Sequence, residues 1–538
     1  MLDLIKKIPN KLKSYYKTYA INNNVKKFIA FNKLRWPYQK NSNNIILVDL
    51  FDWYPFVYIY SYVINILNKK YKLSAKYFYF PLYLAKSLKF KFSIFKIEKI
   101  FNSFNVSKGI NSLEFQIKEA NIKKFEKLFK KIKSKESLSK YKYKNLRIGD
   151  LIYDTYLRAT FSPTINLENK NLKEIFIKAH IYFDNVEKYF KKNKVKVVIV
   201  SHHVYIQYGI IARYSVSKKI PVIMIHYLKA GQENFNLVKL DENCIKDFPY
   251  YNYKKEFNKL GSLKQKRALK LGKELITNRV AGKKDFTSIY MNKSTFSSKF
   301  ILKNFKIKKN INTIIIYSHH FYDSPQRHRH MIFPDFYEYL KFFCKQSLKF
   351  NDYQWIIKPH PNDTSSSNYI YDEIIKNYPN VKILPKETSN LEITKIKPKL
   401  IITNHSTAGH EFAYLGIPIL NTGDNIHIAF DFNYHAKNKK DIIMVLKNLN
   451  LLKKNKFNKQ NIYKFMYMHY LHYFRRYERN KLIGKNYFYT KRILENKKNV
   501  ENDSKLLEYY IKNDVKISKN VEIYVENFIN KELKLKIN

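Results

Sequence analysis

Cysteine is almost absent from this sequence: 538 residues contain two, Cys244 and Cys344, far apart. Two distant cysteines do not form a disulfide framework or a thiolate metal site, so we expect the chain to work in a reducing compartment. Proline is also scarce, with 15 residues. Neither a proline-rich linker nor an internal repeat is evident, so the domain organisation has to be inferred from the pattern of strands and helices.

Long apolar runs are lacking as well. No apolar block follows the basic start of the chain, and no run approaches the ~20 apolar residues that a membrane-spanning helix needs. Even the most aromatic stretch, 77–95, is interrupted by Lys86, Lys89 and Lys91. We therefore expect a cytoplasmic protein that is not integral to a membrane.

Acidic residues are few relative to basic ones, 43 against 101, which gives a formal net charge of +58. Such a charge attracts polyanions over long range. However, Lys, Asn, Ile, Tyr and Phe are abundant together, as AT-rich coding produces at tolerant surface positions. No zinc-finger spacing, RNA-binding signature or helix-turn-helix is recognisable, so we expect no specific nucleic-acid partner.

The N-terminal segment, 1–44, is basic and partly amphipathic. It fits peripheral attachment to an anionic membrane surface at the inner face of the cytoplasmic membrane. It equally fits a helix packed on its own domain, and the sequence leaves both alternatives open.

A chain of this length is expected to fold as two or more domains. Apolar runs alternate with helical periodicity in two series, which predicts an α/β fold with two doubly wound Rossmann-like domains facing a cleft. The predicted domains are 45–305 and 306–430, followed by a helical C-terminal extension, 431–538; no elements are placed between about 230 and 310. Strands are predicted at 45–48, 195–200, 221–225, 313–317, 355–358, 381–384 and 400–403. Helices are predicted at 172–190, 336–348, 368–378, near 391 and from 411, the last of which Gly416 and Pro418 end before a further strand.

Two motifs follow predicted strands of the second series. Lys-Pro-His-Pro occupies 358–361, and Asn-His-Ser-Thr-Ala-Gly-His-Glu occupies 404–411, ahead of the Gly-Ile-Pro-Ile-Leu of 416–420. Ligands of open α/β sheets bind at the carboxyl ends of the strands. A loop of small hydroxyl residues that opens a helix offers backbone N–H groups to an anion.

This pair of motifs resembles the nucleotide-binding domain of GT-B glycosyltransferases that build bacterial capsules and other surface polysaccharides. Within that class it is most similar to Kdo- and sialic-acid-transferring enzymes and to CDP-glycerol glycerophosphotransferases. The resemblance covers about 310–425 well and 145–230 weakly. Lys358 stands where many relatives have Arg, and Asn404-His405 replaces an Asp-Tyr of the polyol-phosphate transferases, which disfavours a polyol-phosphate product.

The resemblance implies a nucleotide sugar of the CMP, CDP or UDP type as co-substrate, a glycan or lipid-linked acceptor, and no further cofactor. Charge that develops on the leaving phosphate requires fixed hydrogen-bond donors. We expect Glu411 either to accept the ribose hydroxyls or to support the start of its helix. The residues expected to bind the donor or its phosphate are Lys358, His360, Asn404, Ser406, Thr407, Ala408, Gly409, Glu411, His319 and His320.

Transfer with inversion also needs a base for the acceptor hydroxyl. Four residues of the first domain are candidates, and the sequence does not choose between them: Asp150, His202, His203 and His226. Asp150 lies in a Gly-Asp pair similar, in reversed order, to the acidic-Gly motif that supplies the base in the sialyl-transferring relatives.

No metal site is predicted. His319, His320, His328 and His330 are close in sequence, but neither a His-Glu-x-x-His pattern nor a carboxylate cluster accompanies them. The leading hypothesis is thus a metal-independent glycosyltransferase of surface-polysaccharide assembly, with a CMP-activated acidic sugar as one candidate donor. The alternatives are a CDP-polyol phosphotransferase, a nucleotide-sugar epimerase of the same fold, and a non-catalytic scaffold that binds polyanions or membranes.

Overall fold

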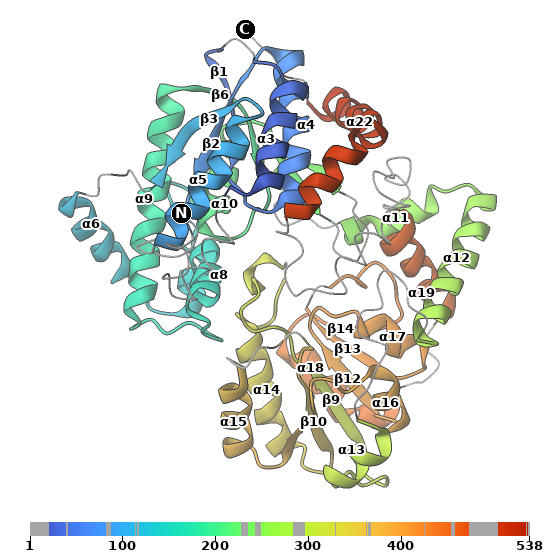
Figure 1. Ribbon diagram of the computed structural model, residues 1–538. Helices are drawn as coiled ribbons and strands as arrows, with labels where there is room; N and C mark the ends of the chain where they lie inside the picture. The colour runs from blue at the N-terminus through green and yellow to red at the C-terminus, as the bar shows by residue number, and fades with distance from the viewer. Residues whose placement is uncertain are drawn as a thin grey trace, which may run out of the picture.

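The computed structural model describes residues 21–38, 41–81, 88–112, 115, 118–227, 235–242, 249–282, 296–328, 330–361, 363, 367–423, 425–452, 458–472, 504–533 and 535. These residues form two α/β domains, each built on a six-stranded sheet (Figure 1). The predicted fold class, two doubly wound α/β domains, is confirmed.

The first sheet has the strand order β3-β2-β1-β6-β7-β8. All neighbours are parallel except β8, which runs antiparallel to β7. The order of the strands along the sheet therefore reverses its direction between β1 and β6, as it does in doubly wound folds. The strands are β1 (Asn44–Asp49), β2 (Ser74–Tyr79), β3 (Val106–Asn111), β6 (Lys194–Val200), β7 (Val222–Tyr227) and β8 (Phe235–Leu240).

The second sheet is parallel throughout, in the order β11-β10-β9-β12-β13-β14. Its central strands are continuous apolar runs because helices cover both faces. The strands are β9 (Thr313–Tyr317), β10 (Gln354–Lys358), β11 (Val381–Ile383), β12 (Leu400–Thr403), β13 (Ile419–Thr422) and β14 (Tyr434–Ala436). The predicted strands of this series are confirmed. The edge strand β14, however, lies in 431–538, which was predicted to be a helical extension, so the second sheet extends beyond the predicted boundary at 430.

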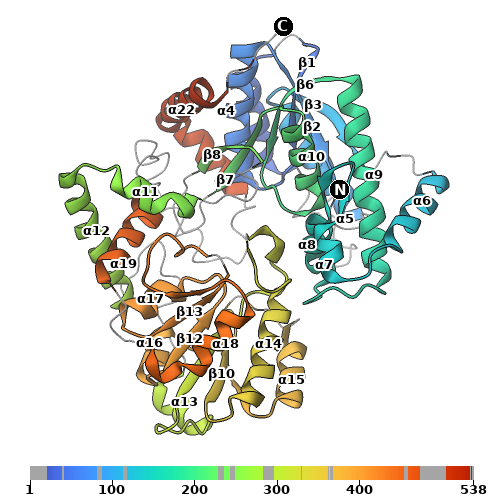
Figure 2. The ribbon, with the colours of Figure 1, turned by 180° about the vertical axis from the view of Figure 1, so that it is seen from behind.

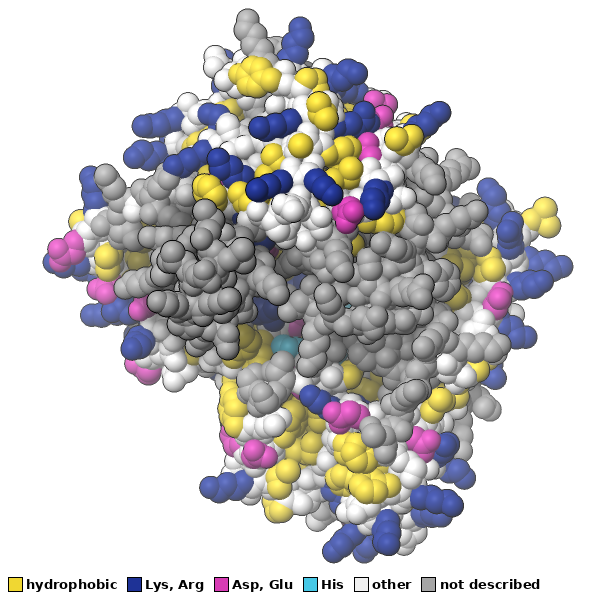
Figure 3. Space-filling view, in the orientation of Figure 1, with side chains coloured by type: hydrophobic (Ala, Val, Ile, Leu, Met, Phe, Trp, Pro, Cys, Tyr) yellow, Lys and Arg dark blue, Asp and Glu magenta, His cyan; other side chains and the backbone are white. Residues whose placement is uncertain are grey.

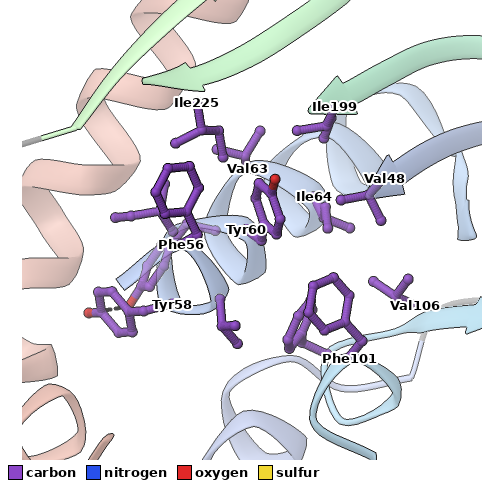
Figure 4. Close-up of a cluster of buried hydrophobic side chains, with 14 of the residues drawn as sticks. Val48, Phe56, Tyr58, Tyr60, Val63, Ile64, Phe101, Val106, Ile199 and Ile225 are labelled. Atoms are coloured by element: carbon purple, nitrogen blue, oxygen red, sulfur yellow. Dashed lines mark hydrogen bonds between the residues drawn. The ribbon is translucent and has the colours of Figure 1, made fainter. Parts of the chain in front are cut away.

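Helix α4 (Tyr54–Tyr71) fills the core on one face of the first sheet. Pro55 stands at its start, where a missing N–H breaks no helical hydrogen bond, and fourteen of its residues are buried. Figure 4 shows its Val63 and Ile64 directed toward Val48, Ile199 and Ile225 of the strands. The other helices of this domain are α3 (Asn23–Arg35), α5 (Leu88–Asn102), α6 (Glu119–Phe129), α7 (Lys135–Lys140), α8 (Gly149–Thr160), α9 (Lys170–Lys192) and α10 (Tyr205–Ser217), with a short hairpin of β4 (Lys142–Tyr143) and β5 (Leu146–Arg147).

The second sheet is covered by α14 (Phe336–Lys349), α15 (Asn368–Asn377), α16 (Asn390–Lys395), α17 (Ala408–Tyr414) and α18 (Lys439–Lys447). Three further helices lie within the predicted first domain, 45–305: α11 (Tyr253–Asn258), α12 (Ser262–Val280) and α13 (Ser298–Asn304). Their buried Tyr253, Ile276 and Ile301 share a hydrophobic core with Ile315 of the second sheet.

The two ends of the described chain pack on the first domain. Helix α3 buries Val25 and Phe28 in the first core, as the packed-helix alternative for its segment predicted. Helix α22 (Ser504–Glu532) returns from the C-terminal region, and its Tyr510 stacks on Tyr58 at 4.4 Å between ring centroids. Helix α19 (Lys459–Tyr467), by contrast, packs on α12 in the second domain.

None of the described helices combines the length and the apolar character that crossing a bilayer requires. On the face shown in Figure 3, Lys and Arg side chains are spread over both domains and do not form a single patch.

Candidate functional site

The carboxyl edges of the two sheets face each other. His203 and Val204, directly after β6, line one pocket together with Gln326 and Arg327 from the segment after β9. In Figure 2 the segment that leads from β9 to α14 rises toward α8 of the first domain. Asp154 of α8 accepts a hydrogen bond from the Gln326 backbone N–H at 3.1 Å. Residues at these two edges can therefore act on one ligand.

Asp335 ties the domains together beside this pocket. It caps α14, where its side chain accepts from the backbone N–H of Glu338, and it also accepts a hydrogen bond from Tyr153 Oη of the first domain at 2.6 Å. Helix α8 is thereby held at a defined position above the second sheet.

Lys358 is the last residue of β10 and is buried. Its Nζ donates to the backbone carbonyls of Pro359 at 2.9 Å and Lys386 at 2.8 Å. Burial lowers the pKa of Lys358 to about 8, while Glu387 and Asp363 oppose that change. Two of the three ammonium hydrogens are thus directed at the backbone, so Lys358 shapes the loop as well as supplying charge.

His360 is held at the same edge by the neighbouring strand. The His360 backbone N–H donates a hydrogen bond to the Oγ of Ser318, the residue directly after β9, at 3.0 Å. The His360 ring lies 5.6 Å from His319 and 6.4 Å from His320 between centroids, and His319 stacks on Phe336 at 4.1 Å. The structure therefore brings together the three histidines expected at the donor site.

Burial lowers the pKa of each of these three rings below its ordinary value. Burial lowers the pKa of His360 to about 3, and the nearby His319 and His320 act in the same direction. A neutral imidazole donates through one N–H and accepts at its other nitrogen. The site is accordingly able to hydrogen-bond an anion without carrying fixed positive charge on His360.

Asn404 and His405 follow β12 and carry polar atoms without partners. Asn404 is 1 % exposed, and neither its Oδ1 nor its Nδ2 is hydrogen-bonded within the described part of the chain. The same holds for His405 Nε2, although the His405 ring stacks on His328 at 4.2 Å. A buried polar group without a partner costs about 1–3 kcal/mol, so such atoms call for ordered water or a ligand.

The hydroxyl residues open α17. Ser406 Oγ accepts a hydrogen bond from the Ala408 backbone N–H at 3.2 Å, and Thr407 is the N-cap residue. Gly409 is required here, since a Cβ atom at that position would lie 2.4 Å from the His427 ring. The helix start is therefore packed closely behind the loop that carries Asn404 and His405.

Glu411 is occupied by protein partners. Its Oε1 accepts from Arg279 Nε at 2.7 Å and its Oε2 from Asn390 Nδ2 at 2.5 Å, and both charged side chains are buried. Both carboxylate oxygens of Glu411 are thus engaged by side chains of α12 and α16, which is neither of the two roles expected for this residue. Arg279 was not anticipated, because it lies in a stretch where the sequence pattern predicted no elements.

The candidate bases lie in different settings. Asp150 receives a bidentate contact from Arg213, at 2.6 and 3.0 Å, and lines the interdomain pocket with His203. His202 is half-buried, with its Nδ1 3.0 Å from Ser201 Oγ. His226 has its backbone in β7, paired with Asn236, and its side chain lies outside what the structure describes.

Within the described residues, no three His, Cys, Asp or Glu side chains are grouped so as to hold a metal ion. Cys344 is a free, buried thiol, and Cys244 lies outside the described residues.

No protein-family model and no curated protein sequence matches the chain. Among solved structures, UDP-GlcNAc 2-epimerase from Neisseria meningitidis bound to UDP-GlcNAc matches at 13 % identity over 79 % of this chain and 98 % of that one, with a TM-score of 0.25. The beta Kdo 2,4 transferase KpsC of Thermosulfurimonas dismutans matches at 10 % identity over 52 % and 81 %, with a TM-score of 0.34. Similarity this low does not assign an activity to the chain. Its fold class rests on the two sheets themselves.

Proposed function

We propose that this protein is an inverting, metal-independent glycosyltransferase of surface-polysaccharide assembly. The donor is a nucleotide sugar, and a CMP-linked acidic sugar suits the site best because a single phosphate has to be neutralised. The acceptor is a growing glycan or a lipid-linked glycan at the cytoplasmic face of the membrane. No further cofactor takes part.

One observation carries the proposal: Asn404 holds a buried amide without a partner, beside His405, at the carboxyl edge of β12. A bound nucleotide would supply the missing partners. The neighbouring loop after β10 presents His360, which is close to His319 and His320.

These groups define roles for the reaction. The acceptor oxygen bonds to the anomeric carbon, and the bond from that carbon to the phosphate oxygen breaks, with its electron pair leaving on the nucleotide. His360 and the hydroxyls of Ser406 and Thr407 hydrogen-bond the phosphate as its charge grows, which lowers the barrier. A side chain of the first domain takes the acceptor proton.

Nucleotide binding is the first test. Thermal-shift measurements with CMP, CDP, UDP and GDP should show stabilisation by at least one of them, because a ligand that binds only the folded state raises its stability. Asn404→Leu, which is close in size and removes the amide, should abolish that shift while the free protein keeps its fold. Absence of any shift at low and high salt would instead favour the scaffold alternative.

Product analysis separates the enzymatic alternatives. Transfer of a sugar, transfer of a polyol phosphate, and epimerisation of the donor each give a different product from CMP-, CDP- and UDP-linked substrates. A polyol-phosphate or epimerised product would replace the proposed activity.

A further inference from the structure

Asp49 and Ser201 meet where the first sheet reverses its strand order. Asp49 is the last residue of β1, and Ser201 directly follows β6. From this pair the sheet continues through β2 and β3 on one side and through β7 on the other. In doubly wound sheets the crevice at such a reversal is where ligands bind.

The Asp49 carboxylate bridges the two strand ends. Its Oδ2 accepts from the Ser201 backbone N–H at 2.8 Å and from Ser201 Oγ, and its Oδ1 accepts from Tyr60 Oη of α4. Ser201 Oγ in turn lies 3.0 Å from His202 Nδ1. A continuous chain of hydrogen bonds thus runs from Tyr60 through Asp49 and Ser201 to His202.

The single hydroxyl hydrogen of Ser201 decides which atom donates in the hydrogen bond between Ser201 Oγ and His202 Nδ1. A serine hydroxyl has one hydrogen, and in Ser201 it is directed at an ionised carboxylate, which only accepts. His202 Nδ1 must then be the donor to Ser201 Oγ. In the neutral imidazole the other nitrogen, Nε2, carries the lone pair and is the proton acceptor.

Aromatic side chains fix the plane of the ring. Tyr208 of α10 stacks on His202 at 5.4 Å with an interplanar angle of 30°, and Phe51, two residues after β1, contacts it edge-on at 5.6 Å. His202 is half-buried. Ser201, Tyr208 and Phe51, from three separate segments of the chain, therefore orient the His202 ring.

Two tyrosines interact with Asp49, and an acidic and a basic residue lie in the same region. Tyr60 and Tyr208 each interact with the Asp49 charge. Asp52 also interacts with Tyr208, and Lys96 of α5 partly offsets the charge of Asp52. Burial raises the pKa of Asp49 to about 6, while hydrogen bonds from Ser201 and Tyr60 hold it down. The carboxylate is ionised at pH 7 and above.

We propose that Asp49 and Ser201 are positioning residues that hold His202 in the tautomer whose Nε2 removes the proton from the acceptor hydroxyl. This inference rests on the proposed function and selects His202 from the candidate bases. The proton passes from the acceptor oxygen to Nε2 as that oxygen bonds to the anomeric carbon. The resulting imidazolium keeps its Nδ1 hydrogen bond to Ser201, and the nearby Asp49 carboxylate offsets its charge.

Nuclear magnetic resonance of ¹⁵N-histidine-labelled protein reads the tautomer without any turnover. At pH 7.5 the His202 signals, assigned by their loss in His202→Gln, should show the Nδ1–H form. Ser201→Ala should abolish that preference, and Ser201→Thr, which keeps the hydroxyl, should restore it. The control is Ser215→Ala, a buried serine of α10 bonded to the Ile211 carbonyl, which should leave the tautomer unchanged. An Nε2–H form in the unmodified protein would overturn the inference.

Steady-state kinetics test the catalytic consequence. Ser201→Ala should lower kcat on the order of 10²-fold, the smaller end of what a general base contributes, with nucleotide affinity unchanged. Asp49→Asn removes a negative charge that favours imidazolium, so the acid limb of the kcat/KM profile should move to lower pH. Ser201→Ala with normal turnover would sink the inference while leaving the proposed function intact. If the unmodified protein binds no nucleotide, the proposed function itself is contradicted.

Discussion

Arg279 of α12 and Glu411 of α17 form a buried ion pair, with Arg279 Nε 2.7 Å from Glu411 Oε1 and side-chain exposures of 1 % and 2 %. The two residues are 132 positions apart in the chain. The pair joins α12, which precedes the second sheet, to α17, the helix that follows the loop of Asn404 and Ser406. It therefore helps to hold that loop in position.

Removing one member of this pair should destabilise the protein strongly. Arg279→Met removes the cation that pairs with the buried Glu411 carboxylate, and such a change costs about 3–5 kcal/mol. Urea unfolding measures the loss. The control is Lys123→Ala, because Lys123 and Glu119 form a pair that is 70 % and 78 % exposed; exposed pairs contribute at most about 1 kcal/mol. Similar losses in the free energy of unfolding for both variants would contradict the conclusion that burial makes the Arg279–Glu411 pair important for stability.

His360→Ala should lower turnover by a factor on the order of 10² or more, because one preorganised donor to the leaving phosphate is lost. Ser406→Ala should act in the same direction more weakly. Circular dichroism should show an unchanged fold in both. His180→Phe serves as a control histidine change, since His180 is buried among aromatic rings in the first domain and contacts no proposed ligand. Normal turnover in folded His360→Ala would remove His360 from the site.

Acidification should destabilise the protein from about pH 6.5 downward. Burial lowers the pKa of His180 and His469 to about 4 and of His405 and His360 to about 3, from an ordinary value of 6.5. In this window the unfolded chain binds more protons than the folded one, so stability falls with pH by about 1.4 kcal/mol per unit for each such histidine. Asp49 has the opposite effect, because its pKa is raised to about 6 in the folded protein. Between about pH 4 and 6 its contribution to stability rises as the pH falls, which offsets the loss from one of these histidines. Urea unfolding at successive pH values gives the slope.

The His180→Phe variant tests this account at one position. Its slope between pH 6 and 4.5 should be smaller than that of the unmodified protein by about 1.4 kcal/mol per unit. An equal slope in both proteins would mean that His180 is not held neutral by burial.

Chelation should leave activity intact. The proposed stabilisation of the leaving phosphate comes from His360, Ser406 and Thr407, so turnover in excess EDTA should equal turnover without it. Loss of activity on chelation, restored by Mg²⁺ or Mn²⁺, would show that a divalent ion shares this role.

Deletion of residues 1–20 should weaken binding to vesicles that contain phosphatidylserine, with a steep dependence on salt, since each nearby Lys or Arg contributes about 1 kcal/mol. The cut stops at residue 20 because Val25 and Phe28 of α3 belong to the first core. Nucleotide binding should be unaffected. Unchanged vesicle binding would assign the membrane affinity to the basic side chains spread over both domains.

Strand and helix positions in the second domain could be predicted from the sequence. Apolar runs such as 313–317 and 400–403 are buried on both faces, and local alternation with amphipathic helices is enough to indicate a doubly wound sheet. The placement of His360 and Ser406 at one sheet edge followed from the same pattern, because parallel strands end at the same edge.

Contacts between distant segments were beyond such a prediction. The stretch from α11 to α13 has no clear periodicity, and only packing shows that it joins the second core. Asp49 directly follows the predicted strand 45–48 and ends the observed β1. Its role depends on β6 lying beside β1, a pairing that brings together residues 152 positions apart. Sequence by itself determined the alternating elements and the two motifs, since these depend on neighbours along the chain. Tertiary structure alone decided that Arg279 pairs with Glu411 and Asp49 with Ser201, because burial and hydrogen bonding between remote segments exist only once the sheets are assembled.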